Sequence, residues 1–338
     1  MREALFYEKL DGGLVQCHLC SHECKIRAGQ FGVCGVRGNS SGTLYTYSYG
    51  NVVAADIDPV EKKPLYHFLP GSNSFSVACA GCNFKCGFCQ NWEISQRLNP
   101  IENTLEEDEF SPQDLVDEAL RNACQSISYT YTEPTVFFEY AYDTAKIAKA
   151  SGLRNIFVTN GYISDGPLKE ISLYLDAVNV DLKFFKEDSY QKFCGASLSK
   201  VLQSIKLFKS LNIWVEITTL VIPGVNDSEE ELTETADFIS GVDNNIPWHV
   251  SRFYPAYKFG NYPITLEETL KKAQKIGNES GLKFIYAGNV NGWGSDTICP
   301  FCGKLLIKRD GFKIKEYNIA NNSCIRCQST IPGILSSD

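Results

Sequence analysis

Three cysteines stand close together in one short run of this chain. Cys82, Cys86 and Cys89 occupy Cys-Asn-Phe-Lys-Cys-Gly-Phe-Cys, a CxxxCxxC spacing that brings three thiolates onto one tight loop and supplies no fourth. Three soft ligands suit an iron–sulfur cluster with one iron left open. A closed structural zinc site takes four ligands, whereas chemistry at a metal needs a vacant position. This cysteine loop (residues 82–89) therefore predicts a reactive centre.

A small zinc knuckle is the alternative, because Cys79 and Cys82 form one Cys-x-x-Cys pair and Cys86 and Cys89 form another. Zinc pairs usually lie farther apart than three residues. Cys79 also ends the apolar stretch Phe75-Ser-Val-Ala-Cys79, which is typical of a strand, and buried cysteines are common. The pattern therefore favours the cluster.

The cysteine loop resembles the motif of the radical S-adenosylmethionine (SAM) enzymes, including the aromatic Phe88 before the last cysteine. The resemblance implies a [4Fe-4S] cluster whose open iron chelates the amino and carboxylate groups of SAM, with Phe88 beside the cofactor. One electron would then cleave the sulfonium to a 5′-deoxyadenosyl radical. The expected partners are a reductant such as ferredoxin or flavodoxin and a protein or small-molecule substrate.

A second set of cysteines lies near the start of the chain, on a glycine-rich frame: Cys17, Cys20, Cys24 and Cys34. Four cysteines can close a tetrahedral site. The metal is either zinc or a second iron–sulfur cluster, since four cysteines serve both. His18 and His22 are expected to be solvated or to lie behind the ligands, although either could replace a cysteine.

A third set consists of two Cys-x-x-Cys knuckles separated by 21 residues: Cys299, Cys302, Cys324 and Cys327. A hairpin with its turn at Asp310-Gly311 would join them, and the spacing predicts a zinc ribbon. The basic residues of this hairpin are expected to be solvated: Lys304, Lys308, Arg309, Lys313 and Lys315. We expect an added tail that stabilises only its own lobe.

Composition limits the classes of partner and compartment. The chain has 338 residues, with 32 Lys and Arg against 40 Asp and Glu, a net charge of −8 that gives no basic field for nucleic acid. No run approaches the ~20 apolar residues of a transmembrane helix, and the first residues have no signal-peptide core. Most of the 14 cysteines fall in close clusters, which favours metal ligation in a reducing compartment. We expect a cytoplasmic protein without a membrane partner.

The chain divides into three expected parts. Residues 1–71 hold the N-terminal four-cysteine module and a charged, proline-rich lip, in which Lys62, Lys63 and His67 are expected to be solvated. Residues 72–290 hold a partial barrel of the radical SAM kind. Residues 291–338 hold the zinc ribbon.

The middle part alternates β-rich and helical patterns, which is the sign of βα units. Expected strands are residues 74–79, 125–130, 154–159, 176–181, 212–219, 247–253 and 282–287. Ser111 can cap a helix that begins at Pro112, with Leu115, Val116, Ala119 and Leu120 on one face. The fold class is α/β, a partial (β/α)6-type TIM barrel with its chemistry at the carboxyl ends of the strands.

Polar residues follow several of these strands, and they narrow the resemblance. The chain looks like the activating enzymes of glycyl-radical enzymes, and most like the radical SAM enzymes of the AmmeMemoRadiSam system. The resemblance implies SAM contacts for Glu133 of Tyr-Thr-Glu-Pro, although both glycines of the family's Gly-Gly-Glu-Pro are absent here. It implies further SAM contacts for Asp181 and Lys183, which match Asp-x-Lys, and for His249. Asn160 at the end of the third strand could also bond SAM.

Each of these residues also has a simpler interpretation. Asp181 and Lys183 could form only a rim salt bridge, Asn160 could only shape an Asn-Gly turn, and a lone strand histidine is usually a core group. Cys124 and Cys194 are expected to be structural, with Cys194 as a minor candidate for a hydrogen-atom donor.

The leading functional hypothesis is a radical SAM enzyme that abstracts hydrogen, with glycyl-radical installation as one form of that reaction. A methylating or otherwise modifying radical SAM enzyme that acts on protein or RNA is the first alternative. A nonenzymatic scaffold of zinc modules is the second.

Overall fold

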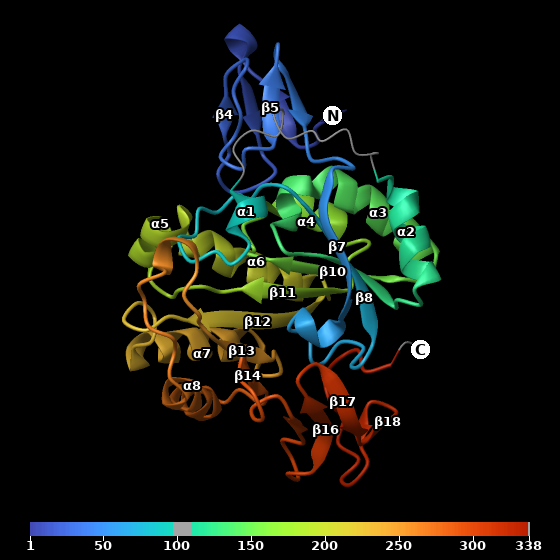
Figure 1. Cartoon of the computed structure of the whole chain (residues 1–338), viewed down its shortest axis with the longest axis vertical. Helices are drawn as coiled ribbons and strands as arrows, with labels where there is room; N and C mark the ends of the chain where they lie inside the picture. Colours follow the sequence, from blue (N-terminus) through green and yellow to red (C-terminus); the bar gives the residue numbers. More distant parts are fainter. Residues whose placement is uncertain (97–109, 337–338) are drawn as a thin grey trace.

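The computed structural model describes residues 1–96 and 110–336, and within them the centre is an eight-stranded sheet in the order β14-β13-β12-β11-β10-β9-β8-β7 (Figure 1). Its parallel strands are β8 (Asn73–Cys79), β9 (Ser126–Tyr129), β10 (Arg154–Thr159), β11 (Ala177–Asp181), β12 (Trp214–Val221), β13 (Trp248–Arg252) and β14 (Ile285–Gly288). These match the seven strands predicted from the alternating pattern.

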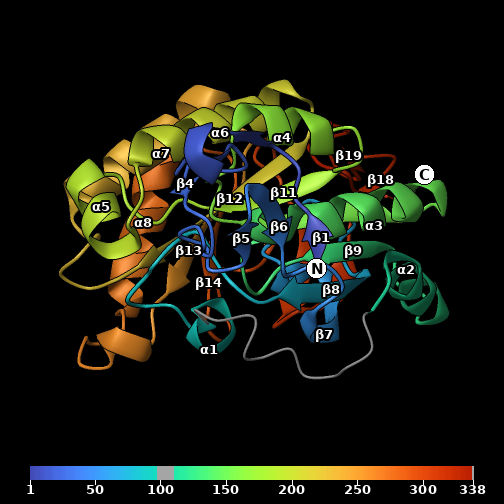
Figure 2. The ribbon, with the colours of Figure 1, turned by 90° about the horizontal axis from the view of Figure 1, so that it is seen from above.

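Helices connect successive strands and cover the outer face of the curved sheet (Figure 2). They are α1 (Trp92–Ser95), α2 (Pro112–Arg121), α3 (Phe138–Ala150), α4 (Asp165–Ile171), α5 (Glu187–Cys194), α6 (Leu198–Ser210), α7 (Glu229–Asp243) and α8 (Glu267–Glu279). β7 (Val52–Pro59) and β14 end the strand order, so the sheet is an open, partial barrel. The predicted α/β class is confirmed. Within the described ranges, no helix is long and apolar enough to span a bilayer.

The first turn of α2 shows how local sequence sets an element. The Ser111 hydroxyl accepts a hydrogen bond from the Asp114 backbone N–H at 3.2 Å, and the Asp114 carboxylate accepts one from the Ser111 backbone N–H. Together these two hydrogen bonds form a capping box. The predicted face is buried at Leu115 but not at Leu120, which is 46% exposed. Leu120 lies about 140° around the helix from Leu115, so it falls at the margin of the buried face.

Two small sheets stand above the barrel in Figure 1 and form the N-terminal module. One has the order β1 (Arg2–Glu3), β6 (Thr43–Thr46), β5 (Arg37–Ser40), and the other β2 (Tyr7–Lys9), β3 (Val15–Cys17), β4 (Lys25–Ile26). Arg37 fixes this module to α3, because its Nη1 donates to both carboxylate oxygens of Glu139, at 2.7 and 3.0 Å.

The segment expected to be a solvated lip is mostly buried. β7 pairs antiparallel with β8, and Val60 and Phe68 pack against Ile156 on the sheet face opposite the helices. Lys63 is 2% exposed and His67 is 1% exposed, so the prediction that they are solvated is wrong. The sequence pattern could not show that Asp58 lies within 2.5 Å of the Lys63 ammonium and compensates its burial. Lys62 is exposed, as expected.

The ribbon, described for residues 291–336, lies below the barrel in Figure 1. It has β15 (Thr297–Ile298), β16 (Leu305–Asp310) and β17 (Lys313–Tyr317) in one sheet and β18 (Ile319–Ala320) and β19 (Ser323–Cys324) in another. Arg309 is buried, and its Nη2 donates to the Tyr66 carbonyl at 2.8 Å. The Leu69 N–H donates to the Ile334 carbonyl. The ribbon is therefore joined to the barrel by hydrogen bonds. The predictions that Arg309 is solvated and that the ribbon is an isolated lobe are not borne out.

Candidate active site and cysteine centres

The cysteine loop leaves the carboxyl end of β8 and passes close to the N-terminal module. Gly81 begins the loop with a φ of +100°, in the left-handed region that favours glycine. A Cβ at this position would lie 2.7 Å from Val36 Cγ1 and 3.0 Å from the Cys34 carbonyl oxygen. Both the backbone conformation and this close approach therefore require glycine.

Each cysteine of the loop has a different polar neighbour. The Phe84 N–H donates to Cys82 Sγ at 3.3 Å, and Cys89 Sγ lies 3.2 Å from Ser95 Oγ in α1. Cys86 Sγ lies 3.5 Å from the sulfur of Cys194, the last residue of α5. Cys86 is buried, whereas Cys82 and Cys89 are half-buried. The contact with Cys194 could not be inferred from spacing, because 108 residues separate the two cysteines.

Glu133 and Asn160 meet directly behind this loop. The two carboxylate oxygens of Glu133 accept hydrogen bonds from the Thr159 hydroxyl at 2.7 Å and from the Asn160 backbone N–H at 2.8 Å. Burial raises the pKa of Glu133, although these hydrogen bonds oppose the shift. The Asn160 amide nitrogen donates to Asn83 Oδ1 at 2.7 Å and lies 3.8 Å from Cys82 Sγ. Asn160 therefore contacts the cysteine loop directly, whereas Glu133 contacts the backbone of Asn160.

Asp181, Lys183 and Phe88 form a second group on the same rim. Lys183 Nζ lies 2.8 Å from Asp181 Oδ2 and 5.9 Å from the centre of the Phe88 ring. Burial disfavours the Lys183 ammonium, but the charge and hydrogen bond of Asp181, together with Cys86 and Cys194, outweigh burial, so the pKa of Lys183 is well above its usual value. Phe88 packs edge-on against Phe184. An exposed carboxylate and an ammonium therefore stand beside the loop.

His249 has its polar partner in the barrel interior. It is the second residue of β13, and its Nε2 lies 2.7 Å from Glu216 Oε2. Burial would raise the pKa of Glu216, but His249, His67 and Trp214 together outweigh burial and the pKa lies below the usual value. The Glu216 carboxylate also accepts hydrogen bonds from the backbone N–H groups of Tyr66 and His67. Through Glu216, these hydrogen bonds link His249 to the buried segment between β7 and β8. A contact between His249 and SAM stays a prediction.

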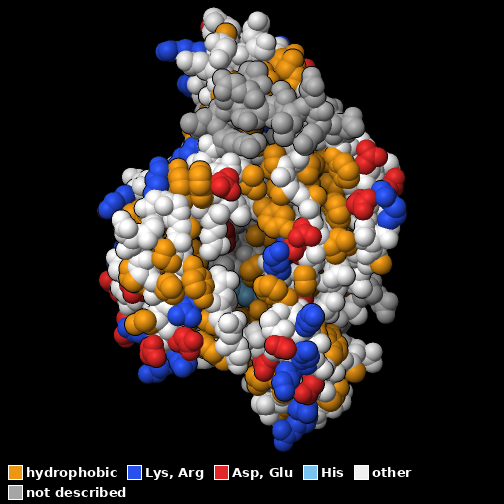
Figure 3. Space-filling model, viewed as in Figure 1, with side chains coloured by type: hydrophobic (Ala, Val, Ile, Leu, Met, Phe, Trp, Pro, Cys, Tyr) orange, Lys and Arg blue, Asp and Glu red, His pale blue; other side chains and the backbone are white. Residues whose placement is uncertain are grey.

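A buried charged network lines the inner face beside β8, and sequence reasoning missed it. Asp58 accepts hydrogen bonds from Lys63 at 2.5 Å, from Ser76 at 2.9 Å and from the Tyr131 hydroxyl. Burial lowers the pKa of Lys63 to about 8, although Asp58 opposes the shift. The face drawn in Figure 3 is hollowed near its centre, with acidic and basic side chains around the hollow. The one available signal was the close cluster of opposite charges from Asp58 to Lys63.

The N-terminal cysteines come together around one cavity. Its lining includes His22, Arg37 and all four cysteines of the predicted site, Cys17, Cys20, Cys24 and Cys34. His18 lies on the surface, 3.4 Å from Glu8. The four cysteines thus share one site, with His22 beside it.

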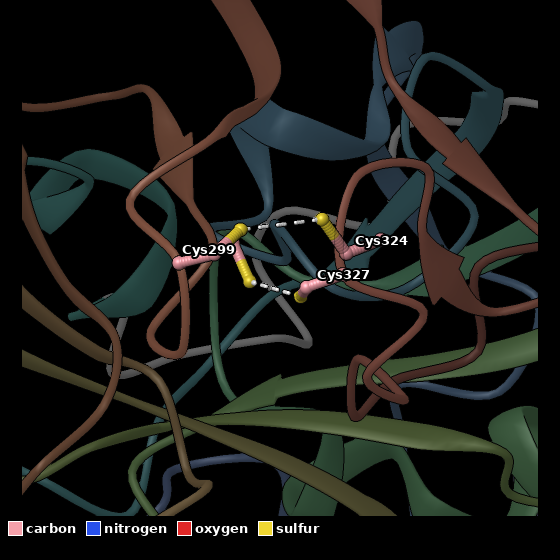
Figure 4. A group of neighbouring side chains, drawn as sticks. Cys299, Cys324 and Cys327 are labelled. Atoms are coloured by element: carbon pink, nitrogen blue, oxygen red, sulfur yellow. Dashed lines mark hydrogen bonds between the residues drawn. The ribbon is translucent and has the colours of Figure 1, made fainter.

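The ribbon cysteines form a compact group. The sulfurs of Cys299, Cys302, Cys324 and Cys327 all lie within 4.8 Å of one another. Figure 4 shows Cys299 facing Cys324 and Cys327. The sulfurs of the pairs Cys299–Cys327 and Cys302–Cys324 are each 3.7 Å apart. This spacing suits four ligands around a single tetrahedral ion.

Comparisons with known proteins agree with this geometry. The family model described as the radical SAM superfamily matches residues 77–239. The uncharacterized protein MJ0808 of Methanocaldococcus jannaschii is 46% identical over 339 residues, which cover 99% of this chain and 100% of that protein. The pyruvate formate-lyase-activating enzyme of Clostridium pasteurianum is 24% identical and covers 58% of this chain and 86% of its own. A radical SAM methyltransferase structure from Sphaerobacter thermophilus superposes with a TM-score of 0.51 at 15% identity, covering 65% of this chain and 67% of that one.

Proposed function

The chain belongs to the radical SAM superfamily, and we propose that it cleaves SAM reductively and abstracts hydrogen from a protein or small-molecule substrate. The observation that carries this proposal is the position of the cysteine loop on the rim of the barrel. Cys82, Cys86 and Cys89 leave the end of β8 next to Asn160 and to the Asp181–Lys183 pair.

The residues present fit a [4Fe-4S] cluster. One loop offers three sulfur donors and no fourth, which leaves one iron open. Cys194 is a fourth nearby thiol, but it ends α5 and is fully buried, so we assign it to packing against Cys86. When bound, the cluster supplies one electron to the sulfonium of SAM, which gives a 5′-deoxyadenosyl radical. A ferredoxin or flavodoxin of the cytoplasm is the proposed donor of that electron.

The rim side chains would hold SAM in different ways. Lys183 would oppose the SAM carboxylate and Asp181 would accept hydrogen bonds from the ribose hydroxyls, because an ammonium only donates and a carboxylate only accepts. Phe88 would lie beside the cofactor, under Lys183. Asn160 would contact both the loop and SAM, and Glu133 would fix the backbone of Asn160 from behind.

The proposed substrate class rests on the relatives. Pyruvate formate-lyase-activating enzymes, and a Methanocaldococcus jannaschii protein with the name putative glycyl-radical enzyme activating enzyme, align over about 60% of this chain. These names favour installation of a glycyl radical. We further propose zinc in the ribbon, where the sulfur spacing suits a single ion.

Anaerobic reconstitution, addition of SAM and a reductant, and detection of 5′-deoxyadenosine test this proposal. The expected result is 5′-deoxyadenosine from the wild type and none from the Cys82→Ala, Cys86→Ala or Cys89→Ala variants. Cys79→Ala and Cys194→Ala are matched thiol controls and should keep the activity.

S-adenosylhomocysteine in place of 5′-deoxyadenosine would indicate methyl transfer instead. A protein without iron and acid-labile sulfide would support the zinc scaffold and rule out the proposal.

A further inference from the structure

The three cysteine sites differ in how closely their sulfurs approach. A Zn–S bond of about 2.3 Å in a tetrahedron places sulfurs about 3.8 Å apart, which is close to the 3.7 Å pairs of the ribbon. Across residues 1–96 and 110–336, no other group of three or more possible metal ligands is as compact as the ribbon. The sulfurs of the cysteine loop and of the N-terminal site therefore do not form so compact a group among the described residues. Ligands bound to separate irons of a cluster need a wider spacing.

The N-terminal cysteines surround a space instead of touching one another. Leu19, Ile26, Val33 and Val136 are the aliphatic side chains that line the cavity shared by the four cysteines. Gly32 keeps this space open, since a Cβ there would lie 3.2 Å from Ile26 Cδ1 and 3.5 Å from Cys24 Sγ. An apolar lining with four inward thiols suits a sulfur-rich group that excludes water.

Arg37 gives an independent indication of what the cavity holds. Its side chain is 2% exposed and lines the cavity, and its Nη atoms donate to Glu139 and to the Leu5 carbonyl. Its Nε–H has no acceptor among the residues that the structure describes. A buried donor without an acceptor costs free energy, and the sulfur atoms of a negatively charged cluster would provide the acceptor.

The cavity shares a wall with the cysteine loop. His22 Nε2 lies 2.8 Å from the Asn83 carbonyl oxygen, so this nitrogen carries the proton and donates. A through-bond path for an electron therefore leads from Cys20 along the chain to His22, through one hydrogen bond to Asn83, and along the chain to the adjacent Cys82. The Cys34 carbonyl meets the same loop at Gly81.

We propose that Cys17, Cys20, Cys24 and Cys34 hold an iron–sulfur cluster and that this cluster relays electrons to the cysteine loop. One electron from a flavodoxin or ferredoxin reduces the N-terminal cluster, which is reoxidised when it reduces the cluster on the loop. The relay rests on the proposed function, whereas the binding of the N-terminal cluster does not.

Metal content tests the cluster without any activity. The variant Cys82→Ala/Cys86→Ala/Cys89→Ala should keep about half of the wild-type iron and acid-labile sulfide, with a reduced paramagnetic signal that SAM does not change. The variant Cys20→Ser/Cys24→Ser should keep the other half, with a signal that SAM perturbs. Ribbon zinc and the circular dichroism spectrum show whether each variant is folded.

Zinc without iron in the folded loop variant would overturn the proposal. A Cys20→Ser/Cys24→Ser variant without iron, beside a loop variant that keeps its cluster, would instead refute the proposed function and leave this inference standing.

Two reductants test the relay in the Cys20→Ser/Cys24→Ser variant. Dithionite is small enough to reduce the loop cluster directly, so dithionite-driven formation of 5′-deoxyadenosine should stay at the wild-type rate. Flavodoxin-driven formation should fall by about tenfold or more. An unchanged rate with flavodoxin would exclude the relay.

Discussion

At the scale of single residues, the rim side chains differ in how far their hydrogen-bonding atoms are already engaged. Both oxygens of Glu133 are engaged and the residue is 1% exposed. Asp181 is 37% exposed and pairs with Lys183. The charged pair is therefore the part of the rim that can change partners when SAM binds.

Asp181→Asn and Lys183→Met should weaken SAM binding while the content of iron and sulfide stays unchanged. A hydrogen bond to a charged group contributes about 1.5–3 kcal/mol, so the dissociation constant should rise by about 10- to 100-fold. Calorimetric titration of the reconstituted proteins with SAM measures this rise. Lys186→Met removes an exposed lysine 3.9 Å from Glu230 and is the matched control. If SAM affinity survives in both rim variants, the pair is only a salt bridge of the barrel.

At the scale of elements, the start of the cysteine loop is where two modules meet at one glycine. Gly81→Ala should destabilise the protein by more than the ~1–2 kcal/mol that a positive φ costs, because the new Cβ would clash with Val36 and the Cys34 carbonyl. Gly152→Ala is the matched control, since Gly152 has a φ of +81° and no atom within 4 Å of the added Cβ. Denaturant unfolding of both variants measures the difference. Equal losses of unfolding free energy in the two variants would mean that the N-terminal module does not pack tightly against Gly81.

The buried segment between β7 and β8 makes stability depend on pH through His67. Its Nδ1 donates to the Pro332 carbonyl and its Nε2 accepts from the Tyr286 hydroxyl, both at 2.7 Å, which requires the neutral ring. Burial lowers the pKa of His67 to about 4. The stabilisation is therefore complete above the unfolded-state pKa of about 6.5 and is lost as the pH falls.

Wild type should lose about 1 kcal/mol more unfolding free energy than His67→Gln when the pH falls from about 6.5 to about 5.5. Denaturant titrations at the two pH values measure this difference. His18→Gln replaces a histidine whose side chain is 39% exposed and is the matched control. A His67→Gln variant with the wild-type slope would show that folding does not lower the pKa of His67.

At the scale of the whole molecule, the sequence predicted what depends on neighbours along the chain. Alternating apolar residues indicated the parallel strands, and short spacings indicated the three cysteine sites, since both patterns are local. Three of the missed features join distant segments: His67 to Glu216, Cys86 to Cys194, and the ribbon to Tyr66. A charged residue in a local pattern is assigned to solvent unless its distant partner is known.

Arg309 is the strongest such case, because it joins the ribbon to the barrel. Its Nε lies 3.5 Å from a carboxylate oxygen of Glu61, and neither side chain is exposed. Arg309→Met would leave the Glu61 charge buried without its partner, which should cost about 3–5 kcal/mol of unfolding free energy. Lys308→Met, beside it on β16, removes an exposed lysine 3.7 Å from Glu316 and should cost at most about 1 kcal/mol. Denaturant unfolding compares the two variants at equal metal content. Equal losses of unfolding free energy would mean that the ribbon is an independent lobe. A larger loss in Arg309→Met than in Lys308→Met means that the ribbon stabilises the barrel that carries the proposed active site.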